Sequence, residues 1–142
     1  MNLDLEALET SFDLVASRGD ELMDVFYAGL FAAAPAVKPL FAGTDLERQK
    51  TMLLGTLVLL RKSLRDLEAI VPKLHELGAG HVAYGATPEH YPVVGGVLIA
   101  SMEEVAGDAW RPEYGRAWCE AFAIVADAMI EGAEAAALAE AA

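Results

Sequence analysis

Residues 77–95 read LGAGHVAYGATPEHYPVVG, and this stretch decides the fold that we expect for the chain. Within it, His81 has three glycines close by: Gly78, Gly80 and Gly85. Glycines at this density predict an irregular backbone, in which a side chain can be turned inward at the end of a helix. Thr87 and Pro88 follow as a favoured N-cap and first helical residue, so a new helix is expected from there to about Gly107.

The chain on both sides of this stretch is predicted to be helical, because apolar residues recur three and four positions apart. No alternation with a period of two persists long enough to indicate a strand. The sequence therefore predicts an all-α protein of six or so helices. The expected elements are a helix ending near Arg18-Gly19, a helix capped by Asp20 and ended by Pro35, a tight turn over 35–41, helices over 45–65 and 66–77, and a last helix from about residue 111 that fades into a frayed tail from about residue 133.

The helix expected over 45–65 is apolar nearly all round. Gln49, Leu53, Leu57 and Leu60 form one stripe, and further leucines, a valine and a methionine occupy the other sides. A helix of this kind is buried on more than one face. We expect it to lie between another helix layer and a bound apolar group.

Length and composition limit the classes of function. The 142 residues suit one domain over 1–142, and 55% of them are hydrophobic. The formal net charge of −12 argues against nucleic acids and anionic membrane surfaces, while a basic protein partner is permitted. The longest apolar run, 51–60, is too short to span a bilayer. The acidic start does not resemble a signal peptide, so a cytoplasmic protein is expected.

The single cysteine, Cys119, excludes an intrachain disulfide and a cluster of thiolate ligands. Because it follows Trp118 on an apolar helix pattern, we expect it to be buried or half-buried packing.

Several segments in the right order and at compatible spacing resemble bacterial single-domain globins and the globin domain of flavohaemoglobins. They cover roughly residues 12–132. The resemblance implies a globin fold of six to eight helices around haem b, which binds O2, NO or CO. The matching segments are 26–31, Pro35, 39–41, Gln49 with Leu53, 77–85, 90–95, Ala117-Trp118, Phe122 and Met129.

In this family a histidine imidazole is the proximal ligand of the iron, and the resemblance assigns that role to His81. His75 is the competing histidine. It lies six residues earlier, between Lys73 and Glu76, and we expect it to be solvated on a polar face. Since no histidine precedes residue 75, a distal histidine is absent from the expected site.

The resemblance also implies the opposite side of the site. Phe41 would pack flat on the porphyrin, and the hydroxyl of Tyr27 would donate a hydrogen bond to bound O2. Gln49 is the second expected donor, with Arg48 as its alternative in a shifted alignment. Leu53, one turn after Gln49, would be an apolar wall that limits ligand access.

Tyr91 follows His90 at the start of the helix after the proximal histidine. In flavohaemoglobin-like chains this tyrosine and a glutamate of the last helix hydrogen-bond the proximal imidazole. The position of that glutamate falls on Ala133 here, with Glu131 and Glu134 beside it. A shift of one residue turns a helical side chain by about 100°, so this sequence departs from the family pattern.

Three functions are open at this point. The first is reversible O2 binding. The second is nitric oxide dioxygenation, which would need a separate reductase, because no flavin or nicotinamide unit is expected within these 142 residues. The third is a globin-like domain without haem that serves in signalling or protein interaction. The joint presence of Phe41, Tyr27 and His81 argues against the third.

Overall fold

The computed structural model of the chain describes residues 3–83 and 87–141 and confirms the all-α class. No strand occurs in the described ranges. None of the helices formed by these residues has the length and apolar character needed to cross a membrane. The elements are α1 (Leu5–Ala16), α2 (Gly19–Ala33), η1 (Pro35–Phe41), α3 (Leu46–Lys62), η2 (Leu67–Ile70), α4 (Val71–Ala83), α5 (His90–Ala106), η3 (Gly107–Ala109) and α6 (Pro112–Ala141), where η marks a 3-10 helix.

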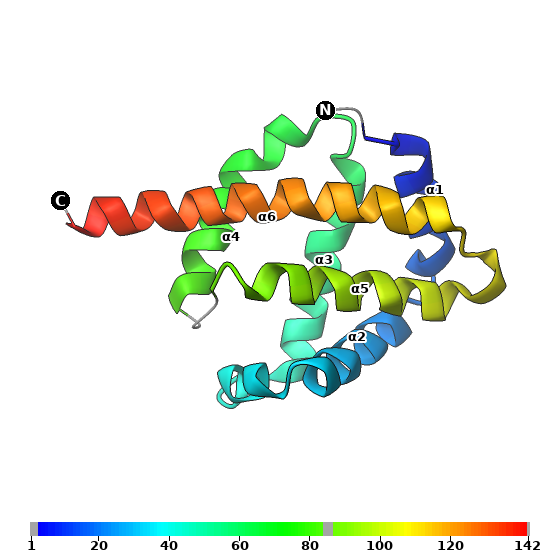
Figure 1. The fold of residues 1–142 in the computed structure, drawn as a ribbon, viewed down its shortest axis with the longest axis horizontal. Coiled ribbons are helices and arrows are strands. Elements are labelled where there is room, and N and C mark those ends of the chain that lie inside the picture. Colours follow the sequence, from blue (N-terminus) through cyan, green and yellow to red (C-terminus); the bar gives the residue numbers. More distant parts are fainter. Residues whose placement is uncertain (1–2, 84–86, 142) are drawn as a thin grey trace.

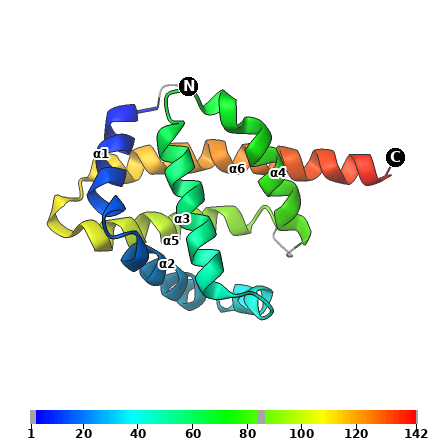
Figure 2. The same ribbon diagram turned by 180° about the vertical axis from the view of Figure 1, so that it is seen from behind.

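The long helix α6 organises the molecule. It runs beside α5 and crosses α4 (Figure 1), and its contact with α4 is the most extensive between two helices of the described chain. Viewed from behind, α3 stands in front of α5 and α6, between α1 and α4 (Figure 2). α3 packs mainly on α1 and α2 and makes few contacts with α4 or α5.

Local signals account for several helix ends. Asp4 Oδ1 accepts a hydrogen bond from the Ala7 amide, and Asp45 Oδ1 accepts from the amides of Glu47 and Arg48, so both helix starts are capped. Pro35 follows the last residues of α2, as predicted. Gly107 ends α5 with a φ of 63°, a conformation that favours glycine.

Two predicted helix starts are wrong. Asp20 does not cap α2, because the Arg18 carbonyl already accepts from the Leu22 amide and the helix begins at Gly19. Thr87 does not cap α5, which begins at His90. Instead, the Thr87 amide donates to His90 Nδ1 at 3.1 Å, and its carbonyl accepts from the His90 amide, so Thr87 belongs to a turn before the helix.

The region before His81 also differs from the prediction. α3 ends at Lys62 rather than near residue 65, and the helix expected over 66–77 is divided into η2 and α4. α4 continues through Gly78 and Gly80 to Ala83, so the predicted irregular backbone is absent up to that residue; Gly85 lies outside the described residues. Packing against α6 outweighs the weak helix propensity of glycine here. α6 itself remains helical to Ala141.

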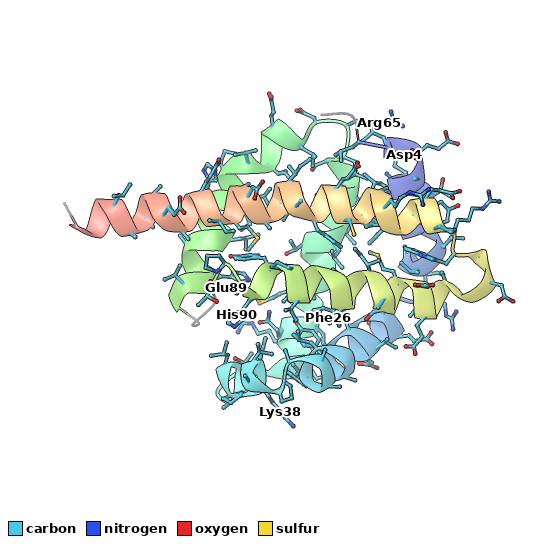
Figure 3. All side chains as sticks on the ribbon, viewed as in Figure 1. Asp4, Phe26, Lys38, Arg65, Glu89 and His90 are labelled. Carbon is cyan, nitrogen blue, oxygen red and sulfur yellow. The ribbon has the colours of Figure 1, made fainter. Side chains whose placement is uncertain are left out.

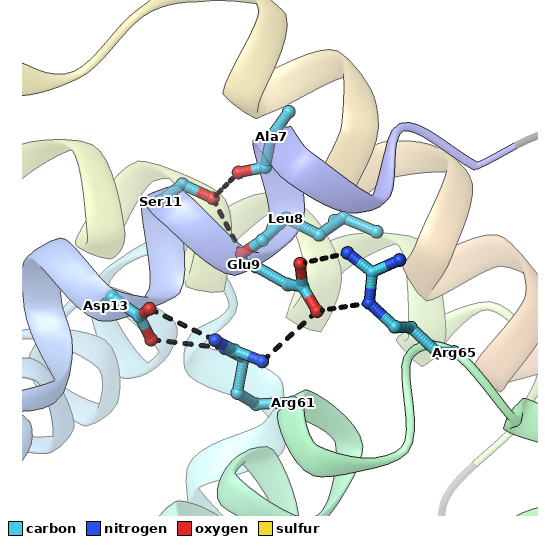
Figure 4. A network of polar contacts seen from close by, with 7 residues as sticks. All are labelled: Ala7, Leu8, Glu9, Ser11, Asp13, Arg61 and Arg65. Carbon is cyan, nitrogen blue, oxygen red and sulfur yellow. Dashed lines mark hydrogen bonds and ion pairs between the residues drawn. The ribbon is translucent and has the colours of Figure 1, made fainter.

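A buried hydrogen bond joins the first and the last helix, α1 and α6. Trp118 on α6 is fully buried, and its Nε1 donates to Ser11 Oγ of α1 at 2.7 Å. The Ser11 hydroxyl in turn donates to the Ala7 carbonyl at 2.6 Å (Figure 4). Cys119 is exposed rather than buried, because the next residue of a helix points about 100° away from its neighbour.

An ion-pair network joins α1 to the end of α3 (Figure 4). Arg61 contacts Asp13 and Glu9, and Arg65 contacts Glu9 at 2.7 Å. The hydrogen bond from Arg65 is the main cause that lowers the pKa of Glu9. Because the pairs lie at the surface and only the Arg61–Glu9 pair is partly buried, we expect each to contribute little, and the buried Ser11–Trp118 bond to matter more.

We predict that Ser11→Ala lowers the free energy of unfolding by about 1–3 kcal/mol, because the Trp118 indole N–H is left buried without an acceptor. Denaturant unfolding followed by tryptophan fluorescence measures the change.

The control for this prediction is Ser101→Ala. Ser101 is also buried, but its hydroxyl donates only to the Val97 carbonyl of its own helix. A smaller loss in this variant is expected, and equal losses in both would contradict the importance of the α1–α6 bond.

Candidate functional site

His81 lies in the last turn of α4 and its side chain is half-buried. Its Nδ1 lies 2.6 Å from the carbonyl oxygen of Leu77, one turn earlier in the same helix. A carbonyl oxygen only accepts hydrogen bonds, so Nδ1 carries the proton. In a neutral ring the lone pair is then on Nε2, the nitrogen farther from the backbone. The helix thus orients an imidazole whose Nε2 is chemically suited to bind a metal.

His75, the other histidine of α4, is not the solvated residue that we expected. Its side chain is 41% exposed, but its Nε2 atom is buried and lies 3.5 Å from Glu131 Oε2 of α6. The close packing of α4 on α6 explains this difference from the sequence-based interpretation. The two histidines therefore have different surroundings, and only His81 has its ring held by a carbonyl of its own helix among the hydrogen bonds described.

Two polar side chains come together from α2 and α3. Tyr27 is buried on α2, and Gln49 is half-buried near the start of α3. Burial raises the pKa of the Tyr27 phenol, while a hydrogen bond with the Gln49 side chain and the charge of Lys50 act in the opposite direction. A raised pKa keeps the phenol neutral, so Tyr27 retains an O–H that can donate a hydrogen bond.

The structure separates Gln49 from Arg48, which the sequence left as alternatives. Arg48 is exposed, and its backbone amide is held by the capping carboxylate of Asp45. Gln49, the next residue, is turned toward Tyr27. Leu53 is half-buried one turn further along α3.

Phe41, the last residue of η1, belongs to an aromatic cluster with Tyr27 and Phe31. Its ring is nearly perpendicular to that of Tyr27, with centroids 5.9 Å apart, and lies 5.5 Å from that of Phe31. Phe26 packs edge-on against Tyr27 at 4.9 Å. These contacts hold the Tyr27 ring in place. The Phe41 side chain itself is half-buried. An apolar groove of about 450 Å³ adjoins the cluster and is lined by Phe31, Pro35, Lys38, Pro39, Phe41, Ala42 and Leu46.

Tyr91 is half-buried in the first turn of α5, and burial alone raises the pKa of its phenol. Figure 3 shows its neighbours Glu89 and His90 beside α4, so the start of α5 lies close to the helix that carries His81. On α6, Glu131 faces His75, Ala133 is half-buried and Glu134 is exposed.

Taken together, these residues fit a flat apolar ligand with a metal at its centre. α3 touches α4 and α5 little, and several apolar side chains on these three helices are only half-buried: Leu53, Val58, Leu77, Tyr91 and Val94. His81 on α4 would supply an oriented nitrogen ligand. Tyr27 and Gln49 supply hydrogen-bond donors on α2 and α3. A haem between these helices would meet the donor set that such a group requires.

Two glycines have a role that the sequence pattern does not indicate. The pattern predicts an irregular backbone at Gly78 and Gly80 alike and gives Gly132 no role of its own. In the structure Gly78 and Gly132 are buried at the crossing of α4 and α6, whereas Gly80 is exposed. The available signal was that a glycine within an otherwise helical pattern often marks a close approach between backbones.

Comparisons with known proteins agree with this geometry. The globin family model matches residues 24–129. The flavohemoprotein of Bacillus thuringiensis subsp. konkukian is 34% identical over 128 residues, which cover 89% of this chain and 31% of the relative. The flavohemoprotein of Rhodopirellula baltica is 35% identical over 124 residues, 84% of this chain and 30% of the relative. The chain thus spans about a third of the length of these relatives.

Solved structures show the same fold at low identity. An engineered carbene transferase from Rhodothermus marinus has a TM-score of 0.86 at 21% identity and covers 97% of this chain and 96% of its own. A bacterial globin from Campylobacter jejuni has a TM-score of 0.79 at 23% identity, with 92% and 94% covered. Since the family model matches well over half of the sequence, the chain belongs to the globin family.

Proposed function

We propose that this globin holds haem b through Nε2 of His81 and reversibly binds O2 on the side of Tyr27 and Gln49. The observation that carries the proposal is the bond from His81 Nδ1 to the Leu77 carbonyl. It fixes the ring and leaves the lone pair on the nitrogen that points away from the helix backbone. Haem, when bound, supplies the iron that takes up a diatomic gas.

The residues around the gas would act through hydrogen bonds and exclusion of water. The Tyr27 hydroxyl and the Gln49 amide, which already contact each other, can both donate to the O2 ligand. A donor in a dry pocket stabilises bound O2 more than CO, because O2 takes on partial negative charge when it binds. Phe41 and Leu53 supply apolar walls that keep water away from the gas.

Nitric oxide dioxygenation is the second candidate. The same two donors suit it, and the sequence similarity to flavohemoproteins favours it. In this reaction O2 and NO combine to give nitrate, and a reductase must supply one electron before the next turnover. The acidic chain, with a net charge of −12, is suited to a reductase with a basic docking surface.

We predict that the purified protein takes up haem with an intense Soret band and that His81→Ala changes the spectra of its ferric, reduced and CO-bound forms. His75→Ala is the matched control, because it removes the other histidine of α4 and should leave the spectra unchanged. A colourless wild type that refuses added haemin would refute the proposal and favour a haem-free interaction domain.

Tyr27→Phe is expected to raise the O2 dissociation rate, because it removes one hydrogen bond to bound O2. A hydrogen bond of this kind stabilises the complex by about 1–3 kcal/mol, which corresponds to a dissociation rate about 5 to 150 times higher in the variant. Stopped-flow exchange of O2 for CO measures this rate. Tyr114→Phe removes a tyrosine hydroxyl near the start of α6, where the ring packs on Trp110 outside the candidate site, and should leave the rate within a factor of about two. A similar rate in wild type and Tyr27→Phe would exclude Tyr27 as the donor.

The two candidate activities are separated by NO consumption in the presence of O2, NADH and a flavin reductase. Sustained consumption over many turnovers with nitrate as product is expected of a dioxygenase. A single turnover that stops at the ferric form, even with an active reductase, would leave O2 binding as the function.

A further inference from the structure

The crossing of α4 and α6 is built from two reciprocal glycine contacts. A Cβ placed on Gly78 of α4 would collide with the backbone carbonyl of Met129 on α6. A Cβ placed on Gly132 of α6 would collide with the backbone carbonyl of His75 on α4. In both cases the added Cβ would lie well under 3.0 Å from main-chain atoms of the other helix, a distance that real Cβ atoms essentially never show. Each helix therefore offers a glycine opposite the backbone of the other.

No other glycine in the described chain is used in this way. A Cβ on Gly19, Gly29 or Gly95 would meet side-chain atoms, which can move aside. A Cβ on Gly55, Gly80 or Gly96 would meet nothing within 4 Å. Only at Gly78 and Gly132 would the obstacle be main chain, which can give way only if one helix moves relative to the other.

The crossing lies one helical turn from His81. Gly78 precedes His81 by three residues and directly follows Leu77, whose carbonyl accepts the hydrogen bond from His81 Nδ1. The backbone that carries both the imidazole and its acceptor is thus the backbone pressed against α6. A displacement of α4 at Gly78 would move His81 and Leu77 together, relative to the helices that carry Tyr27 and Gln49.

We infer that Gly78 and Gly132 are positioning residues for His81. Their lack of a Cβ sets the distance between α4 and α6 and, through it, the position of the imidazole toward the haem iron. This inference rests on the proposed function, because it needs haem to be bound at His81. It assigns a role to two residues that would bind neither the haem iron nor the gas.

The test compares Gly78→Ala and Gly132→Ala with Gly80→Ala, all in the full chain. Gly80→Ala is the matched control, since it makes the same chemical change on α4, one residue from His81, in open space. Resonance Raman spectra of the ferrous protein give the iron–histidine stretching band, and transfer of haem to a haem-free acceptor globin gives its dissociation rate. We expect both crossing variants to shift the band and to lose haem at least about tenfold faster, as for other residues that orient a metal-binding histidine.

A lowered melting temperature with an unshifted band in folded Gly78→Ala and Gly132→Ala would overturn the inference, because the crossing would then be structural only. The same shift in Gly80→Ala would also overturn it.

Wild-type protein supplies a measurement that does not depend on the folding of the variants. With glycine labelled at Cα, nuclear Overhauser effects should connect the Gly78 Cα protons to Met129 and those of Gly132 to His75. They should be present both with and without haem, since the crossing must exist before haem binds if it sets the position of His81. Their absence from either form would overturn the inference.

Failure of the proposed function is distinguishable from failure of this inference. Wild type that binds no haem through His81 refutes the proposed function and, with it, the role of the crossing toward the haem iron, but not its role in holding the His81 ring. In that case, the His81 Nδ1 proton resonance of the haem-free protein still tests whether the crossing holds the ring: the resonance should shift in Gly132→Ala and stay in place in Gly80→Ala.

Discussion

The direct contact between the backbones of α4 and α6 is the constraint on which the described site depends. Helices normally stay apart because side chains separate them, with axes roughly 8–10 Å from each other. Here Gly78 and Gly132 remove that separation, and carbonyl groups of each helix lie against Cα atoms of the other. Close approaches of this kind permit weak Cα–H···O contacts and dense packing. The cost is a less favourable helix propensity at both glycines, which the tertiary contact offsets.

This contact also explains the asymmetry of the two histidines of α4. His75 lies at the crossing, where its Nε2 is buried opposite Glu131. His81 lies one turn beyond the crossing, where its ring is half-buried and held by the Leu77 carbonyl. The same helix therefore places one imidazole in an interhelical contact and holds the other by a carbonyl of its own backbone.

The electrostatic character of the two sides of the site differs. On the side of α2 and α3, two neutral donors lie together beside aromatic rings, where a low local dielectric strengthens hydrogen bonds. On the side of α4, the acceptor of the His81 proton is a neutral carbonyl, and Glu131 is engaged with His75. A carbonyl acceptor pushes less electron density toward the ring than a carboxylate does. With haem held as proposed, this arrangement would favour stable binding of O2 over its activation.

The sequence by itself determined the helical class, the turn after Pro35, the cap at Asp45 and the end of α5 at Gly107, because each of these depends on residues within one turn of one another. The resemblance to globins also identified His81, Tyr27 and Gln49 as candidates. Only the tertiary structure decided that Gln49 rather than Arg48 faces Tyr27, that His75 faces Glu131, that Cys119 is exposed, and that the chain stays helical through Gly78. In each of these cases the partner that decides comes from another helix or depends on the exact rotation of a helix, and a pattern along the chain contains neither.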